Sequence, residues 1–167
     1  IQPQPLLDKI QITAEAGFSG CELWINDIYQ YIGQGGEVRD VANALADNGL
    51  EIPCMIAIRG WGEAIGKEYQ LLLDEARRRM ELAARLGSLF VVATPPRESC
   101  EHNQLTDRFG DLLEIGDQIG TRPTLEYISF FKGLSTLDDA WKIIQSIGGT
   151  ATLIADSFHT WNSHSDR

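Results

Sequence analysis

Two carboxylates occur in this sequence where apolar runs would otherwise form buried strands. Glu126 lies inside the run "TLEYISF", and Asp156 follows the run "ATLIA", with His159 three residues later. A carboxylate in a buried strand is costly unless it is paired or bound to a cation. Neighbouring parallel strands lie about 4.8 Å apart, so two such groups repel each other unless a cation lies between them. Glu126 and Asp156 are therefore candidate ligands of a divalent metal, which favours hard oxygen donors.

Other side chains near the predicted strand ends have both a functional and a structural interpretation. Glu126 and Asp156 could instead pair with Arg or Lys from a neighbouring strand. At the same strand end, His159 is a candidate donor to a substrate oxygen or a neighbour of the metal ligands. Trp24 and Trp61 are candidates for an apolar wall against a sugar face, with core packing as the alternative for each. His102, in the loop "PPRESCEHNQ", either contacts substrate or is a solvated loop residue.

A unit recurs along the chain, in which a helix-like segment ends in glycine and a short apolar run follows. The glycines are Gly17, Gly49, Gly87, Gly120 and Gly148. Glycine accepts the left-handed conformation that ends a helix, and short apolar runs are typical of strands buried in a parallel sheet. The pattern predicts strands at about 20–25, 51–58, 88–94, 123–129 and 151–158, and helices at about 5–16, 37–48, 68–86, 106–119 and 136–147.

Alternating strands and helices indicate an α/β fold, either a (β/α)8 barrel or an open doubly wound sheet. Both architectures place active sites at the carboxyl ends of the strands. A full barrel needs about 250 residues, and this chain has 167. We therefore expect a single domain over residues 1–167 that forms an incomplete portion of a barrel, about strands two to six with their helices, and that is incomplete at both ends.

Composition narrows the classes of partner. The formal net charge is −10, which disfavours binding to nucleic acid. No apolar run reaches about 18 residues, so a membrane span is not expected. The three cysteines, Cys21, Cys54 and Cys100, include no C-x-x-C pair, which argues against a disulfide framework or a zinc ribbon and favours a cytoplasmic location. Whether the protein forms a homo-oligomer stays open.

Several segments together resemble a known family. "EAGFSGCELW", "LADNGLEI", "LEYISFFKGLSTLDDAWKII" and "LIADSFHTW" are similar to the xylose isomerase-like TIM barrels, and more narrowly to sugar phosphate isomerases and epimerases, over about residues 5 to 162. That family holds one divalent metal with a Glu, an Asp, a His and a second Glu. By resemblance, Glu126 and Asp156 match the first two ligands, and His159 matches a histidine that contacts substrate. The other two ligands are expected on later strands, and His164 is interpreted as an exposed loop residue.

The resemblance implies a metal-dependent isomerase or epimerase that acts on a sugar, sugar phosphate or inositol-derived ketose through an enediolate. Glu126 is then a catalytic acid/base, the ion is Mn, Mg, Zn or Co, and the substrate is a small polyol or ketose. A lyase on the same scaffold, of the inosose or dehydroshikimate dehydratase type, is the alternative. An endonuclease IV-type repair enzyme is disfavoured by the three histidines and the negative charge, and a non-catalytic barrel without its metal is a further alternative.

Overall fold

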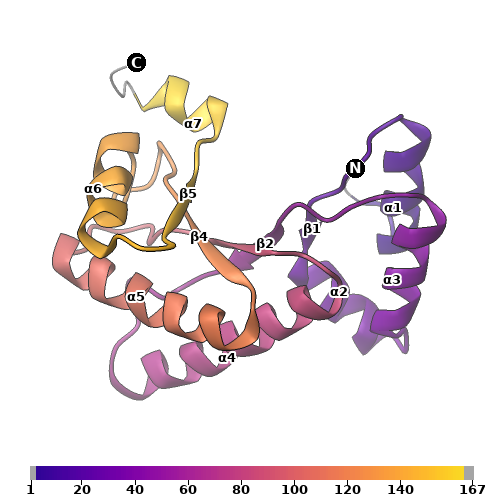
Figure 1. The fold of residues 1–167 in the computed structure, drawn as a ribbon, viewed down its shortest axis with the longest axis horizontal. Helices are drawn as coiled ribbons and strands as arrows, with labels where there is room; N and C mark the ends of the chain where they lie inside the picture. Colours follow the sequence, from indigo (N-terminus) through magenta and orange to yellow (C-terminus); the bar gives the residue numbers. More distant parts are fainter. Residues whose placement is uncertain (1–2, 164–167) are drawn as a thin grey trace.

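The sheet consists of parallel strands that follow one another in space in the order of the sequence. The computed structural model describes residues 3–163. Its strands are β1 (Leu23–Trp24), β2 (Met55–Ile58), β3 (Phe90–Ala93), β4 (Arg122–Glu126) and β5 (Thr152–Ile154). Each strand pairs in parallel with the next (Figure 1). This uninterrupted order is that of a barrel wall and not of a doubly wound sheet, whose strand order reverses. The predicted α/β class and partial barrel are confirmed.

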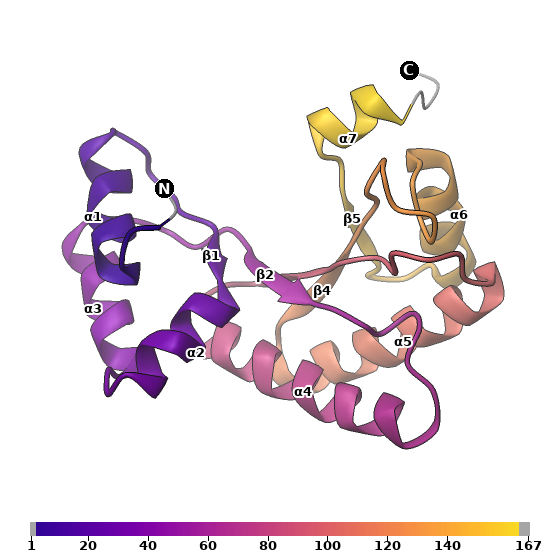
Figure 2. The same cartoon turned by 180° about the vertical axis from the view of Figure 1, so that it is seen from behind.

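Helices alternate with the strands along the chain. They are α1 (Leu6–Glu15), α2 (Ile25–Gly33), α3 (Val38–Asp47), α4 (Gly66–Arg85), α5 (His102–Ile119), α6 (Leu137–Ile147) and α7 (Ser157–Asn162). The longer ones, such as α4 and α5, cover one face of the sheet (Figures 1 and 2), whereas α7 follows the last strand and stands beyond its end. The five predicted helices are present, although α5 begins four residues earlier than expected. Two short helices, α2 and α7, were not predicted. Within residues 3–163, no helix combines the length and apolar character that crossing a membrane requires.

The last two strands are shorter than the sequence predicted, and this changes the setting of both carboxylates. β4 ends at Glu126, so this side chain lies at the strand's end and not in its interior. β5 ends at Ile154, and the chain turns into α7 instead of continuing to residue 158. Asp156 caps α7, because its Oδ1 accepts a hydrogen bond from the His159 backbone N–H at 2.9 Å. An aspartate at this position favours the start of a helix over an extended chain.

Local signals explain the ends of the longer helices. Thr136 caps α6 by accepting a hydrogen bond from the Asp139 N–H at 3.2 Å. Gly120 ends α5 with a φ of 87°, the left-handed conformation that glycine adopts most readily. The two glycines within α5 do not break it, and Gly116 has a packing reason: a Cβ there would lie 2.4 Å from the Thr121 carbonyl oxygen. Close approach of the chain entering β4 therefore requires glycine at this position.

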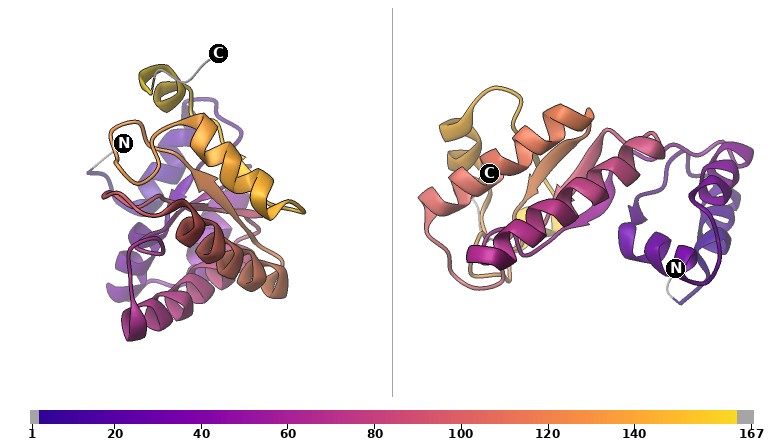
Figure 3. Two further views of the ribbon diagram at one scale, coloured as in Figure 1. Left: turned by 90° about the vertical axis from the view of Figure 1, so that its left-hand side faces the viewer. Right: turned by 90° about the horizontal axis from the view of Figure 1, so that it is seen from below.

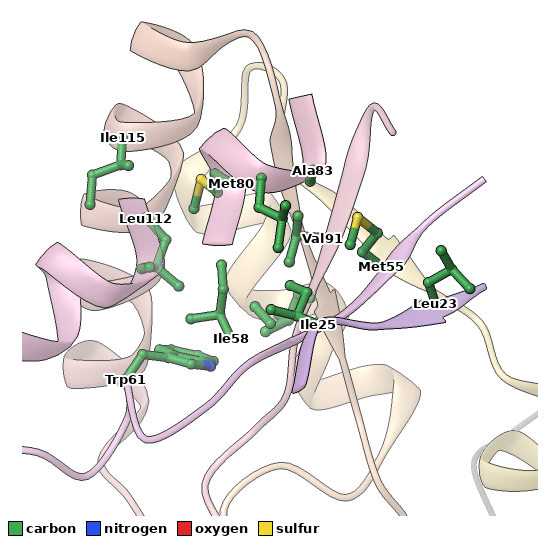
Figure 4. Packing of buried hydrophobic residues seen from close by; sticks show 14 of the residues in the cluster. Leu23, Ile25, Met55, Ile58, Trp61, Met80, Ala83, Val91, Leu112 and Ile115 are labelled. Carbon is green, nitrogen blue, oxygen red and sulfur yellow. The ribbon is translucent and has the colours of Figure 1, made fainter. Parts of the chain in front are cut away.

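The hydrophobic core lies between the helices and the face of the sheet that they cover. Leu23 pairs in register with Met55, and Met55 with Val91, so these side chains share one face of the sheet, and all three are buried. Met80 and Ala83 of α4 belong to the same cluster (Figure 4). Figure 3 shows α4 and α5 lying side by side across this face. Because helices cover this face, side chains on the opposite face are left to form the site.

Candidate functional site

A pocket of about 550 Å³ lies on the face of the sheet opposite this core. Residues in or just beside every strand contribute to it. Strand register aligns Trp24 with Ile56, Ile56 with Val92, and Val92 with Thr124. Side chains alternate between the faces of a strand, so Glu126, two residues after Thr124, points to the same side. Glu126 in turn lies opposite Ile154, and Asp156 follows two residues later. The topology therefore brings Glu126 and Asp156 to one pocket.

Glu126 is the most perturbed carboxyl group at this pocket. Its pKa is raised from 4.5 to about 7, chiefly because burial disfavours the charged form, and further because the carboxylates of Asp156 and Glu22 lie nearby. The Arg59 guanidinium opposes this shift. Within residues 3–163, no ion pair within 4.0 Å engages Glu126 or Asp156. The alternative in which each carboxylate has its own Arg or Lys partner is therefore not what the structure shows.

Asp156 has a structural contact as well as a place in the pocket. One carboxylate oxygen, Oδ1, accepts the His159 backbone N–H. The hydrogen bonds of residues 3–163 do not use its other oxygen, Oδ2. Asp156 can therefore cap α7 and present an oxygen to a ligand in the pocket at the same time.

Glu22 is a third carboxylate that lines this pocket, and no role was predicted for it from the sequence. Burial raises its pKa and Asp156 raises it further, whereas a hydrogen bond with the Cys54 thiol lowers it. Burial and the neighbouring Glu22 in turn raise the pKa of Cys54 to about 12. The available signal was spacing: Glu22 stands two residues before Trp24, which places both side chains on one face of the strand. Its neighbour Cys54 could be found only from the strand register.

The carboxylates fit a divalent cation as two of its ligands. They offer hard oxygen donors, and the pKa of Glu126 is raised chiefly by burial and further by the neighbouring carboxylates of Asp156 and Glu22. Within residues 3–163, no group of three or more His, Cys, Asp or Glu side chains is arranged to hold a metal ion. The described part of the chain therefore supplies Glu126 and Asp156 as candidate ligands but not a complete metal site.

Of the other three predicted site residues, Trp24, His159 and His102, one lines the pocket and two do not. Trp24 lines the pocket and is 45% exposed. His159 lies beside the pocket without lining it, and its Nδ1 is 3.2 Å from Ser129 Oγ. His102 is exposed in the first turn of α5 and does not line the pocket.

Two further sequence interpretations have different outcomes. Trp61, considered alongside Trp24 as a sugar-facing wall, is fully buried in the core and donates its Nε1–H to the Thr94 carbonyl at 2.7 Å. His164 lies outside the residues that the structure describes.

The raised pKa of Glu126 predicts how the stability of the metal-free protein depends on pH. Its folded-state pKa of about 7 lies above the ordinary value of 4.5, so the folded state binds more protons than the unfolded state between these values. The free energy of unfolding should therefore fall as pH rises from about 4.5 to about 7. Urea unfolding of chelator-treated protein at several pH values measures this decline. The Glu126→Gln variant should show a smaller decline than wild type, and an unchanged decline would contradict the prediction; Glu81→Gln, on the exposed side of α4, is the control.

The sequence is similar to a known protein family and to characterised enzymes. A family model described as "Xylose isomerase-like TIM barrel" matches residues 10–167. A 3-dehydroshikimate dehydratase of Pseudomonas aeruginosa is 29% identical over 165 residues, which cover 96% of this chain and 26% of that protein. The chain thus spans about a quarter of the length of this curated relative.

Solved structures share the fold. A xylose isomerase-like TIM barrel/4-hydroxyphenylpyruvate dioxygenase fusion protein superposes with a TM-score of 0.87 and 27% identity, over 98% of this chain and 26% of that one. The IolI protein, whose structure contains a zinc atom, superposes with a TM-score of 0.84 and 18% identity, over 98% of this chain and 62% of that one. Because the family match extends over nearly all of the sequence, the chain belongs to the xylose isomerase-like TIM barrel family, as its motifs predicted.

Proposed function

We propose that this chain contributes the active site of a metal-dependent dehydratase that removes water from a hydroxylated cyclic ketone of the 3-dehydroshikimate type. The observation that carries the proposal is the pairing of Glu126, with its pKa near 7, and Asp156 at one pocket. The 29% identity to a 3-dehydroshikimate dehydratase, along 96% of this chain, supports this reaction above the isomerase reading of the motifs.

The chemistry assigns the proton transfer to Glu126. Its carboxylate removes the proton from the carbon next to the ketone, and the electron pair forms an enediolate. The hydroxyl on the following carbon then takes up a proton and leaves as water, so that one C–H and one C–O bond break and a C=C bond forms. No oxidant or reductant is needed. A carboxyl whose pKa lies near neutral pH can both accept a proton and return it.

Glu126 and Asp156 are the residues of this chain that would hold the divalent ion. When bound, such an ion polarises the ketone and stabilises negative charge on its oxygen. The zinc in the structure of the IolI protein supports a divalent ion in this fold. Trp24, at the pocket wall, offers an apolar surface to the ring of the substrate.

Isomerisation or epimerisation of a ketose, the first reading of the sequence motifs, is the second candidate, and one observation favours it. Glu22 and Glu126 both line the pocket and both have raised pKa values. Two carboxyl groups of this kind can remove a proton at one position and deliver one at another. Both candidate reactions begin with the same enolisation and differ only in whether a hydroxyl leaves.

Product analysis tests the proposal. We expect the purified protein, loaded with a divalent metal, to convert 3-dehydroshikimate into 3,4-dihydroxybenzoate, the aromatic compound that forms on loss of one water. Chromatography with ultraviolet detection measures the product, and a chelator should stop its formation until metal is restored. Ketoses incubated in deuterium oxide and followed by NMR provide the comparison. Deuterium exchange into a ketose without any aromatic product from 3-dehydroshikimate would replace the dehydratase assignment with the isomerase one.

A further inference from the structure

Two guanidinium groups line the carboxylate pocket from loops after neighbouring strands. Arg59 follows β2 directly, and Arg97 lies in the loop after β3. Four carboxylate side chains line the same pocket. Even so, among residues 3–163 no ion pair within 4.0 Å engages either arginine. Both positive charges therefore stand in an acidic pocket without a direct carboxylate partner.

Aromatic rings, and not carboxylates, support the two guanidinium groups. The Arg59 Cζ atom lies 5.3 Å from the centre of the Trp24 ring, and the Arg97 Cζ atom lies 5.5 Å from the centre of the Phe131 ring. A guanidinium that lies over a ring keeps the N–H groups along its edge available to donate hydrogen bonds. The hydrogen bonds of the described residues use neither guanidinium. The N–H groups of both guanidinium groups are thus available to donate hydrogen bonds to a ligand in the pocket.

The backbone that carries Arg97 and Phe131 is held in place by contacts between two loops. The Lys132 N–H donates to the Arg97 carbonyl at 2.8 Å, and a Cβ on Gly133 would lie 2.4 Å from the Pro96 carbonyl oxygen. The loops therefore approach as closely as backbone atoms allow. Holding a binding group in place before the ligand arrives lowers the entropy lost on binding.

We propose that Arg59 and Arg97 together bind an anionic group of the substrate, a carboxylate or a phosphate ester, so that the pocket selects an anionic hydroxyketone over a neutral polyol. Four carboxylates would repel such an anion, and the two arginines are the positive side chains that line the pocket. Planar guanidinium groups match both oxyanions with paired hydrogen bonds. The inference rests on the proposed function for the position of the substrate, and it adds which side chains select that substrate by charge.

Equilibrium binding tests the inference without requiring turnover. Calorimetry on the metal-loaded protein compares 3,4-dihydroxybenzoate with catechol, which differs only in lacking the carboxylate. A second comparison uses a ketose phosphate and the same ketose without phosphate. The variants are Arg59→Gln, Arg97→Gln and Arg59→Lys. The lysine variant keeps the positive charge but removes the planar guanidinium group that donates paired hydrogen bonds. Arg39→Gln is the matched control, because Arg39 is an exposed residue of α3 outside the pocket.

We expect wild type and Arg39→Gln to prefer the charged member of one pair. Each pocket variant should lose about 10- to 100-fold of that preference, the range for a hydrogen bond to a charged group, and Arg59→Lys should lose part of it. The pair that shows the preference identifies the anion as carboxylate or phosphate. Equal binding of charged and neutral ligands by wild type, or an unchanged preference in both glutamine variants with native circular dichroism, would overturn the inference. A protein that binds the anion in this way without dehydrating 3-dehydroshikimate would refute the proposed reaction alone.

Discussion

The Glu126→Gln variant is expected to lose about a thousandfold in turnover number while keeping its fold. Removal of a general acid or base slows a reaction by about 10²- to 10⁴-fold, and Gln has nearly the shape of Glu but cannot accept the proton. Glu126 is the last residue of β4 and pairs with β5 through its backbone. The substitution leaves those backbone hydrogen bonds intact, so the loss should appear in the chemical step.

Three measurements separate this expectation from a structural effect. Turnover is measured with saturating substrate and metal, deuterium exchange at the carbon next to the ketone is followed by NMR, and metal content is determined on the same sample. With metal added to saturation, the variant should still retain substantial metal, because the Gln carbonyl oxygen and Asp156 remain, and should lose exchange. Glu81→Gln controls for loss of a surface carboxylate. Undiminished exchange by a metal-loaded Glu126→Gln protein would remove Glu126 from the mechanism.

The parts of the fold that could be predicted are those set by short-range signals. Glycines after apolar helical stripes marked the helix ends, and each of the five marker glycines adopts a positive φ. The strands followed as short apolar runs between them. The helix α2 was missed because it begins at Ile25, directly after β1, and no capping side chain marks its start. The strand predicted at about 20–25 therefore extended into the first residue of this helix.

The arrangement around the site depended on information that only the sheet register contains. That Glu126 and Asp156 belong to neighbouring strand segments could be predicted from the order of the apolar runs, but not that β4 ends at Glu126 and β5 ends before Asp156. The contact of Glu22 with Cys54 could not be predicted, because the two residues directly precede different strands, β1 and β2, and meet only when Leu23 aligns with Met55. Stacking of arginines on aromatic rings likewise joins loops far apart in the sequence.

The arginines of α4 make one kind of contact that follows from spacing along the helix and another that depends on the tertiary fold. Within the basic run Arg77–Arg79, Arg78 and Arg79 pair with Glu75, which lies three and four residues before them on α4. Arg79 also donates to the Ala57 carbonyl at 2.8 Å. That carbonyl belongs to β2 where its pairing with β3 is irregular, between Ile56 and Ile58. The arginine therefore satisfies a backbone group at an irregularity that spacing along the chain does not reveal.

Replacing Asp156 should separate its two roles, because one carboxylate oxygen caps α7 and the other is free for the pocket. Asn is as good a helix cap as Asp, so Asp156→Asn should unfold at nearly the wild-type temperature. It should nevertheless bind a divalent metal at least about a hundredfold more weakly, since even changes to residues that only support metal ligands cost 10- to 100-fold. Asp156→Ala should show the same loss of affinity and a further destabilisation of about 1 kcal/mol from the missing cap.

Competition with a chromophoric chelator measures the metal affinity of each variant, and thermal unfolding of the metal-free proteins measures the contribution of the cap. Tight metal binding by Asp156→Asn would exclude this carboxylate as a ligand, and equal stability of the Asn and Ala variants would exclude the capping role. The cap also accounts for the spacing of the D-x-x-H motif. A side chain at the N-cap position accepts from the N–H three residues on, so the geometry that lets Asp156 begin α7 also fixes His159 beside the pocket, with its Nδ1 near Ser129. One local hydrogen bond thus positions both polar residues of the motif.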